Sequence, residues 1–286
     1  MQIDVMALVA AFGGGLFGAA IGTLPAFIFT GFLVLVGVAV AASGGGTEVL
    51  SNVAFGSVFG PHISFAGGAA ATAYAYKRGL LETGRDISIP LMGLNRPDVL
   101  IVGGAFGIAG YLLNALWQMI GLGPRTDTIA LTVVVSAMIA RLVFGNTGLI
   151  GKNFTPDDTN NWVRFQESPG QIVTIGVGVG LLSAYIATVF GAGRGGDVMG
   201  FGIAAASLLF AQFGLKVPVT HHIALPAAVA AIASGNMYVG AIFGIVGALT
   251  AEICSRLFHM HGDTHVDPPA AGIAVTTVLI RMVWPG

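Results

Sequence analysis

Residues 102–112 read VGGAFGIAGYL, and residues 239–249 read VGAIFGIVGAL. Val, Gly, Phe, Gly, Ile, Gly and Leu recur at the same positions, so seven of the eleven residues are identical. Chance pairing within one chain gives far fewer identities, and self-similarity at a fixed distance is the signature of an internal repeat. The two stretches therefore predict that the chain consists of two related halves.

The repeat extends to both sides of these stretches. At a constant offset on each side, the matched polar pairs are Asp127 and Asp267, Arg141 and Arg281, and His62 and His222. Small residues recur every four positions near the start of each half, as Gly14, Gly18 and Gly22 in the first and Gly176, Gly180 and Ala184 in the second. The halves are about 1–145 and 171–286, and the polar stretch 146–170 is predicted to be a cytoplasmic linker.

The composition is that of a membrane protein. The 286 residues are 55% hydrophobic and only 9% charged, and their mean hydropathy is +0.86. Soluble chains carry roughly 25% charged residues, so a soluble enzyme is excluded. The net charge of −1 provides no basic surface for a nucleic acid. Membrane lipids are therefore the expected surroundings, in the plasma or inner membrane.

Hydropathy predicts ten spans, on the rule that about 20 apolar residues cross the hydrocarbon core. They are 5–22, 24–43, 60–76, 98–120, 127–145, 171–191, 198–214, 219–235, 237–258 and 268–284. The Lys and Arg residues of the loops on one side are Lys77, Arg78, Arg85, Arg96, Lys152, Arg164, Lys216 and Arg256, and those on the other are Arg125 and Arg194. The richer side is predicted to be cytoplasmic, which places both termini outside.

Five spans per half is an odd number, so the second half must enter the membrane from the opposite side. The predicted fold is therefore an all-α polytopic membrane protein with two inverted five-helix repeats. Inverted repeats are typical of transporters, because two similar halves around a midplane site can exchange conformations. Residues 44–59 are apolar but too short to span, and they fit a re-entrant segment or an outer loop packed on the bundle.

Polar residues inside spans are candidates for a solute path, because they are costly in lipid. His62 and His222 are the leading pair, and His221, Glu252, Asn114 and Glu48 are further candidates. Imidazole can bind a small polar solute or relay protons. The alternative is structural, with each histidine bonding a neighbouring carbonyl group. Glu252 can likewise form an ion pair with Arg256, four residues later on the same helix face.

Prolines and arginines accompany these candidates. Pro61 and Pro226 flank the histidines. Proline removes a backbone donor, which predicts broken helices in the third and eighth spans, with an ordinary helix kink as the structural alternative. Arg141 and Arg281 lie at equivalent ends of the fifth and tenth spans. Their side chains can extend to the headgroups, or they can bind an anion.

Asp127 and Asp267 are predicted to be helix N-caps, because each directly precedes an apolar span. Asp267 also ends an alternating string of His259, His261, Asp263 and His265. Imidazole and carboxylate groups at this density suit a divalent metal ion such as zinc, manganese or iron. No other cofactor is expected. A membrane metalloenzyme that uses this string is therefore the main alternative to a transporter. If the string binds no metal, it is expected to be a solvated, pH-sensitive loop.

The motif Asp267-Pro-Pro-Ala-Ala-Gly272 resembles that of the HPP family of integral membrane proteins, although that family has His in place of Asp267. The resemblance covers about the last 50 residues, and it implies transport of an anion such as nitrite. No ATP-binding loop is present, so a transporter would be an ion-coupled carrier or a channel-like facilitator for a small solute or ion. The pairs Gly103/Gly107 and Gly240/Gly244 predict a homo-oligomer, and a scaffold subunit of a membrane complex is a third class.

Overall fold

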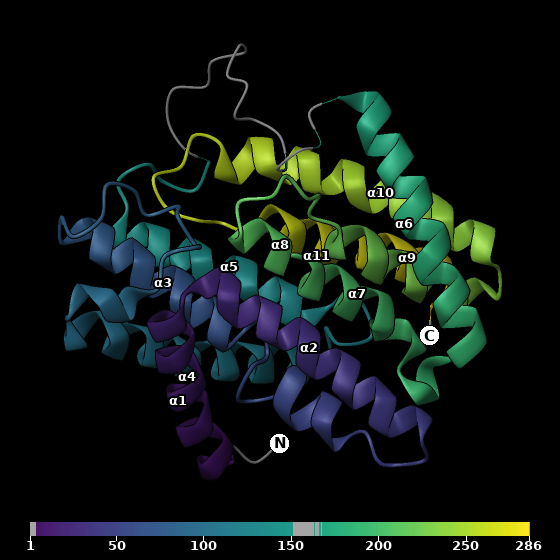
Figure 1. Cartoon of the computed structure of the whole chain (residues 1–286), viewed down its shortest axis with the longest axis horizontal. Helices are drawn as coiled ribbons and strands as arrows, with labels where there is room; N and C mark the ends of the chain where they lie inside the picture. Colours follow the sequence, from purple (N-terminus) through teal and green to yellow (C-terminus); the bar gives the residue numbers. More distant parts are fainter. Residues whose placement is uncertain (1–3, 151–162, 164–165, 167, 286) are drawn as a thin grey trace.

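The computed structural model describes residues 4–150, 163, 166 and 168–285. These residues form helices and no β-strand, so the all-helical prediction is confirmed. The helices (Figure 1) are α1 (Val5–Ile21), α2 (Thr23–Ala42), α3 (Ser64–Lys77), α4 (Pro97–Met119), α5 (Thr128–Phe144), α6 (Pro169–Phe190), α7 (Gly196–Ser207), α8 (Leu209–Gln212), α9 (His221–Ser234), α10 (Met237–Cys254) and α11 (Pro268–Val283). Short helical turns are η1 (Val49–Ala54), η2 (Leu91–Leu94), η4 (Ala192–Arg194) and η5 (Ser255–His259).

Four helices of the described chain are long and apolar enough to cross a membrane. They are Thr23–Ala42, Pro97–Met119, Pro169–Phe190 and Met237–His259. The other predicted spans hold shorter helices, such as α3 and α9 with 14 residues each. Such a helix rises about 21 Å, whereas the hydrocarbon core is about 30 Å thick. Ten helices of full spanning length are therefore not present among the described residues, because several predicted spans combine a short helix with a turn.

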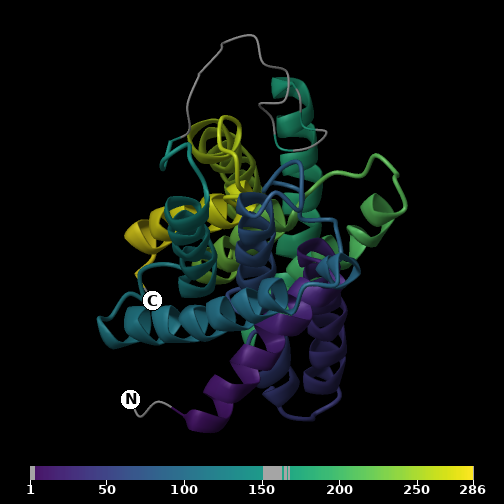
Figure 2. The same ribbon diagram turned by 90° about the vertical axis from the view of Figure 1, so that its left-hand side faces the viewer.

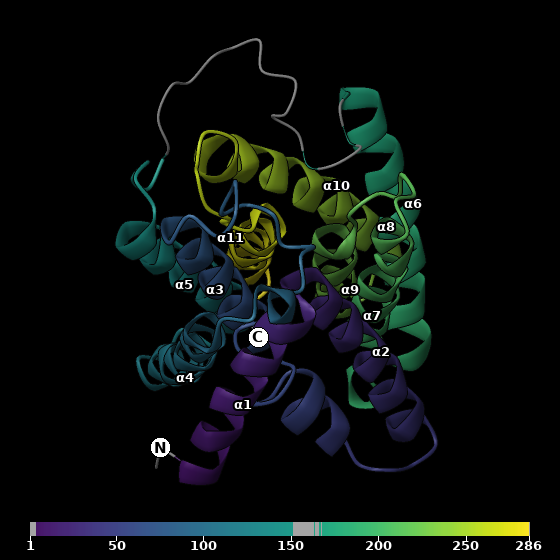
Figure 3. The same ribbon diagram turned by 60° about the vertical axis from the view of Figure 1, so that its left-hand side comes forward.

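The helices of each half contact one another in the same pattern. In the first half α1 packs on α3 and α4, and α3 packs on α4 and α5. In the second half α6 packs on α9 and α10, and α9 packs on α10 and α11. Figure 2 shows α4 crossing α1. In Figure 3 the first half (purple to teal) and the second half (green to yellow) form neighbouring groups, and the main contacts between them are α2 with α7 and α5 with α11.

The two helix pairs that join the halves are antiparallel. The Thr126 hydroxyl, just before α5, donates to the Ala274 carbonyl inside α11 at 2.9 Å. At the other end of α5, Arg141 Nε donates to the Thr264 hydroxyl, just before α11, at 3.0 Å. Because the start of one helix lies beside the body of the other and its end lies beside the start, α5 and α11 run in opposite directions.

The pair α2 and α7 follows the same rule. Gly31 of α2 approaches the backbone of Ala205, and Gly202 of α7 approaches the side chain of Val34. A higher residue number on one helix therefore meets a lower number on the other. Each of these two main helix pairs between the halves thus joins a helix to its repeat counterpart in antiparallel orientation.

Small residues set the register between α1 and α4 in the first half and between α6 and α10 in the second. A Cβ atom on Gly107 would lie 3.0 Å from Cα of Gly15, and a Cβ atom on Gly244 would lie 2.9 Å from Cα of Gly180. The counterpart of Gly180 is therefore Gly15 rather than Gly18, three residues from the match that the spacing predicts. These glycines are used inside the chain, so they give the predicted homo-oligomer no free packing surface.

Pro61 and Pro226 behave differently. Pro61 lies in the turn before α3, whereas Pro226 lies inside α9 without ending it. The predicted helix break at Pro226 is therefore wrong. Pro226 is the sixth residue of the helix, so the hydrogen bond that it cannot make is the one to His222 at the second position. A proline so near the start of a helix deprives only the first turn of a bond.

Two predicted segments need separate mention. Residues 44–59 contain η1, which packs on α2 through buried Leu50 and Ala54. Most of the predicted linker, residues 151–162, 164, 165 and 167, lies outside the described residues, as do the basic residues Lys152 and Arg164.

Candidate functional site: a cavity between the two halves

A cavity of about 270 Å³ lies where the two halves meet. It is lined by the first turns of α3, α5, α9 and α11, by α2 and α7, and by Phe55 after η1. The repeat relates residues that line it from the two halves, since the lining includes Asp127 with Asp267, Phe65 with Leu225, and Pro61 with His221. The site is therefore built from counterpart positions of both halves.

Hydroxyl groups hold two of the helix starts beside the cavity. Thr30 and Ser64 both donate to the carbonyl of Phe59, at 2.6 and 3.2 Å, which fixes the turn that carries Pro61. In the second half Ser183 of α6 donates to the Ala224 carbonyl in the first turn of α9, at 2.6 Å. These bonds place the first residues of α3 and α9 at the cavity wall.

The two aspartates are N-caps, as predicted. Asp127 accepts the Ala130 N–H at 2.8 Å, and Asp267 accepts the Ala270 N–H at 2.8 Å. Asp267 also accepts from Nε2 of His265 at 3.1 Å. The Asp-Pro-Pro motif that resembles the HPP family thus forms the cap and first turn of α11. Both aspartates also line the cavity, a second position that capping alone did not indicate.

Four phenylalanines line the same space, and no sequence pattern indicates that they do so. Phe27 packs edge-on against Phe65 and Phe201, with ring centroids 5.8 and 5.6 Å apart, and Phe55 lies 5.7 Å from Phe201. The His221 ring lies 4.6 Å from Phe27. Aromatic residues at helical spacing read as ordinary core, so only the fold reveals that these rings converge.

A second cavity, of about 580 Å³, adjoins the first. Both are lined by Phe27, Phe65, His221 and Asp267, so these four residues separate the two spaces. The remaining lining comes from the loop residues 83–88 and from residues of other elements, and it includes charged and titratable groups, namely Arg85, Asp86, His259 and His265. By the distribution of loop Lys and Arg, this is the side predicted to be cytoplasmic.

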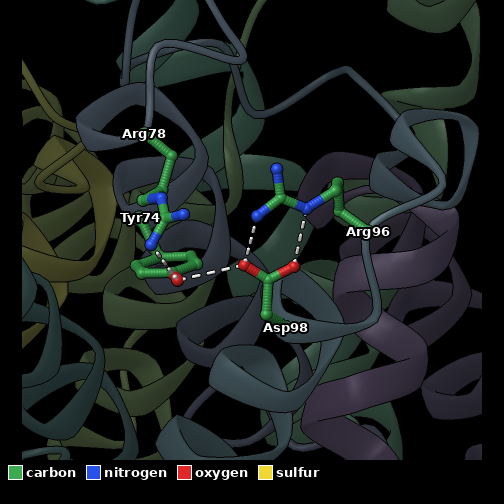
Figure 4. Close-up of polar contacts among 4 residues, drawn as sticks. All are labelled: Tyr74, Arg78, Arg96 and Asp98. Atoms are coloured by element: carbon green, nitrogen blue, oxygen red, sulfur yellow. Dashed lines mark hydrogen bonds and ion pairs between the residues drawn. The ribbon is translucent and has the colours of Figure 1, made fainter.

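Hydrogen bonds join the two ends of the loop 78–96, which borders the second cavity (Figure 4). Arg96 donates from Nε and Nη2 to both oxygens of Asp98, at 2.9 and 2.8 Å, and the Tyr74 hydroxyl donates to Asp98 at 3.0 Å. Arg78 donates to the Tyr74 hydroxyl at 3.4 Å. The hydrogen bond to Asp98 raises the pKa of Arg96 above its usual value. The end of α3 is thereby joined to the start of α4.

His62 and His222 line neither of the two cavities. Both rings are buried, and Nδ1 of each has no hydrogen-bond partner among the described residues. Their backbone carbonyls, however, occupy equivalent contacts, His62 against Gly110 of α4 and His222 against Gly247 of α10. The path role of these two rings stays a prediction, while His221, one residue earlier, contacts both cavities.

The other predicted path residues are spread through the fold. The Glu252 carboxylate is buried and accepts the N–H of Val163 at 3.0 Å, with electrostatic attraction from Arg256. Oδ1 of Asn114 is buried without a partner among the described residues, and Glu48 is exposed beside η1. None of the three lines either cavity.

The alternating string 259–267 is divided among several contacts. The rings of His259 and His265 lie 4.8 Å apart, whereas Asp263 accepts from the Asn146 N–H and the Thr147 hydroxyl. Within the described part of the chain, no three His, Cys, Asp or Glu side chains are arranged to hold one metal ion. The metal-site prediction therefore gains no support from the geometry of the string.

Arg141 is fully buried, and its guanidinium acts within the protein. It donates to the carbonyls of Phe258, Thr264 and Leu149 and to the Thr264 hydroxyl. The first half is thereby joined to the segment before α11. Its counterpart Arg281 is only partly buried. Extension of the Arg141 side chain to the headgroups does not fit these contacts, and binding of an anion stays a prediction.

Comparison with known proteins identifies a family whose function is unknown. No curated protein and no solved structure matches the chain. A family model described as "Family of unknown function (DUF7973)" matches residues 1–159 and, in a second match, residues 152–284. Together the matches cover nearly the whole sequence, and the chain belongs to this family of unknown function.

Proposed function

We propose that this protein is a multi-pass membrane transport protein that moves a small solute or ion through the cavity between two inverted repeats. The observation that carries the proposal is the position of that cavity, between counterpart residues of the two halves and adjoining a polar cavity on one side. A site between two similar halves is where a transporter can expose its solute to each side in turn.

The antiparallel pairing of α2 with α7 and of α5 with α11 supports the inverted arrangement. Counterpart helices that meet in opposite directions are related by a two-fold axis perpendicular to them. If the helices cross a membrane, that axis lies in the membrane plane. The short helices α3, α5, α9 and α11 fit the same interpretation, because each begins at the central cavity and covers the remaining part of the membrane.

The outer surface supports a membrane location. Large apolar side chains are exposed on helices of both halves, such as Phe29 of α2, Leu116 of α4, Tyr185 of α6 and Ile242 of α10. Soluble monomers rarely expose so much contiguous apolar surface. Lipid contact removes the cost of this exposure.

A cysteine-accessibility experiment tests the path without a known solute. Cys254 is the single cysteine and is buried, so Cys254→Ala supplies the background. Ser88→Cys probes the second cavity, and Ala130→Cys and Ala270→Cys probe opposite walls of the central one. A membrane-impermeant maleimide is applied to right-side-out and inside-out vesicles.

We expect Ser88→Cys to react from the cytoplasmic side only, and the two cavity cysteines to react from both sides. Ala248→Cys is the control, since Ala248 is completely buried between helices and should react from neither. Cavity cysteines that react from neither side, or only from one side under all conditions, would contradict transport through this cavity.

A further inference from the structure

The central cavity combines three features that define a ligand class. Its wall is mostly apolar, four phenylalanines belong to it, and two acidic residues, Asp127 and Asp267, line it as well. No lysine or arginine is among the described residues that line it. We propose that this cavity binds a small organic cation with a quaternary ammonium head, an inference that rests on the proposed transport function and names its substrate class.

Charge favours a cation. Ionised carboxylates beside an apolar space are costly unless a positive group pairs with them. The N-terminus of a helix carries the equivalent of about half a positive charge. The cap bonds of Asp127 and Asp267 to their own helices therefore leave each aspartate net negative. A monovalent cation between them would reduce this cost, whereas an anion would be repelled.

The phenylalanines favour an organic cation over a metal ion. The faces of aromatic rings attract cations, and aromatic cages are the known recognition mode for quaternary ammonium groups. Phe27 contacts Phe65 and Phe201, and Phe201 also contacts Phe55. A ligand in the cavity therefore meets several rings. A hard metal ion such as Ca²⁺ needs six or more oxygen ligands, and this wall offers mainly carbon.

The size and polarity of the cavity narrow the class further. Its volume of about 270 Å³ equals that of roughly nine water molecules at about 30 Å³ each, which suits a small ligand. A primary ammonium group would need an acceptor for each of its three N–H bonds. A quaternary head has no N–H bond, so apolar walls do not penalise it. The buried Nδ1 of His221 has no partner among the described residues and is available to a polar tail.

The test is the binding of choline to the purified protein in detergent, measured by isothermal titration calorimetry. Three comparison ligands separate the possible causes. The compound 3,3-dimethylbutan-1-ol has the shape of choline without its charge, sodium chloride supplies a small inorganic cation, and sodium nitrite supplies the anion that the HPP resemblance implies. We expect saturable choline binding and no saturable binding of the other three.

Matched substitutions locate the site. Asn caps helices about as well as Asp, so Asp127→Asn and Asp267→Asn remove charge while keeping the fold, and each should weaken choline binding at least tenfold. Phe201→Leu keeps an apolar side chain but removes a ring, and a loss of about threefold to thirtyfold is expected from cation–π energies. Asp4→Asn, at the cap of α1, and Phe106→Leu, outside the cavity, are controls that should bind as the unchanged protein does.

Three results would overturn the inference: no choline binding, equal binding of the neutral isostere, or unchanged affinity in the aspartate variants. The two proposals fail separately. Choline binding with cavity cysteines that are unreactive would remove transport and keep the cation site. Cysteines that react from both sides, without choline binding, would keep the path and remove this ligand class.

Discussion

The two halves of the chain are alike where their helices pack and different where they face the cavities. Gly107 and Gly244 make the same close contact in each half. At the cavity, in contrast, Pro61 of the first half has His221 as its counterpart in the second, and among the described residues only Asp267 of the aspartate pair has a histidine partner. The repeat therefore specifies the scaffold, while the departures from it carry the chemistry and make one side more polar than the other.

The counterparts Arg141 and Arg281 give the largest expected difference between the halves. Arg141→Met leaves several buried carbonyls without their charged donor, and we expect a loss of about 3–5 kcal/mol in the free energy of unfolding. Arg281→Met should change it by no more than about 0.5 kcal/mol, since Arg281 is partly exposed. Thermal unfolding in detergent measures both. Equal losses at the two positions would show that the burial of Arg141 is not what distinguishes them.

Gly110 and Gly247 should instead give equal effects, because the halves are alike there. Each approaches the carbonyl oxygen of a histidine, so a Cβ atom would collide with backbone that cannot easily move. We expect Gly110→Ala and Gly247→Ala each to cost about 1–3 kcal/mol. Gly13→Ala and Gly178→Ala are the controls, since a Cβ atom meets nothing within 4 Å at either position.

Alanine has the higher helix propensity, so both control variants should be neutral or slightly stabilising. If Gly247→Ala were tolerated while Gly110→Ala unfolded the protein, the close contact would belong to one half only, and the packing symmetry would end at α10.

These comparisons show what the sequence can and cannot predict. The repeat, the helical class and the caps at Asp127 and Asp267 follow from local patterns, because identities and N-cap chemistry are visible in the residues themselves. The alignment of α1 with its counterpart α6 cannot be predicted in this way. Glycines spaced by four residues allow several alignments, and only the contacts of each helix select one. The sequence does not predict that Phe27 and Phe201 line a cavity, because rings that converge from helices far apart in the chain leave no local pattern.

Asp127 and Asp267 both stabilise the start of a helix, but only Asp267 also bonds a histidine. Asp127→Ala removes one N-cap and should cost about 1 kcal/mol. Asp267→Ala removes a cap and also the partner of His265, so its cost should be larger. The measurement is thermal unfolding of both variants, with Asp4→Ala as the control for a cap outside the cavity. A smaller loss for Asp267→Ala would show that the His265 contact does not stabilise the fold.

The smallest expected effect concerns the histidines, and it separates the sequence-based hypothesis from the cavity. His62 and His222 line neither cavity, so His62→Ala and His222→Ala should leave the affinity for choline within about twofold in folded protein, because neither ring would touch a ligand in the cavity. His221→Ala removes a ring that lies 4.6 Å from Phe27 and should lower the affinity measurably. Titration calorimetry on monodisperse samples compares the three. If His62→Ala and His222→Ala weakened binding as much as His221→Ala, the path would run beside the paired rings, as the repeat alone suggests, and the cavity walls described here would need to move during binding.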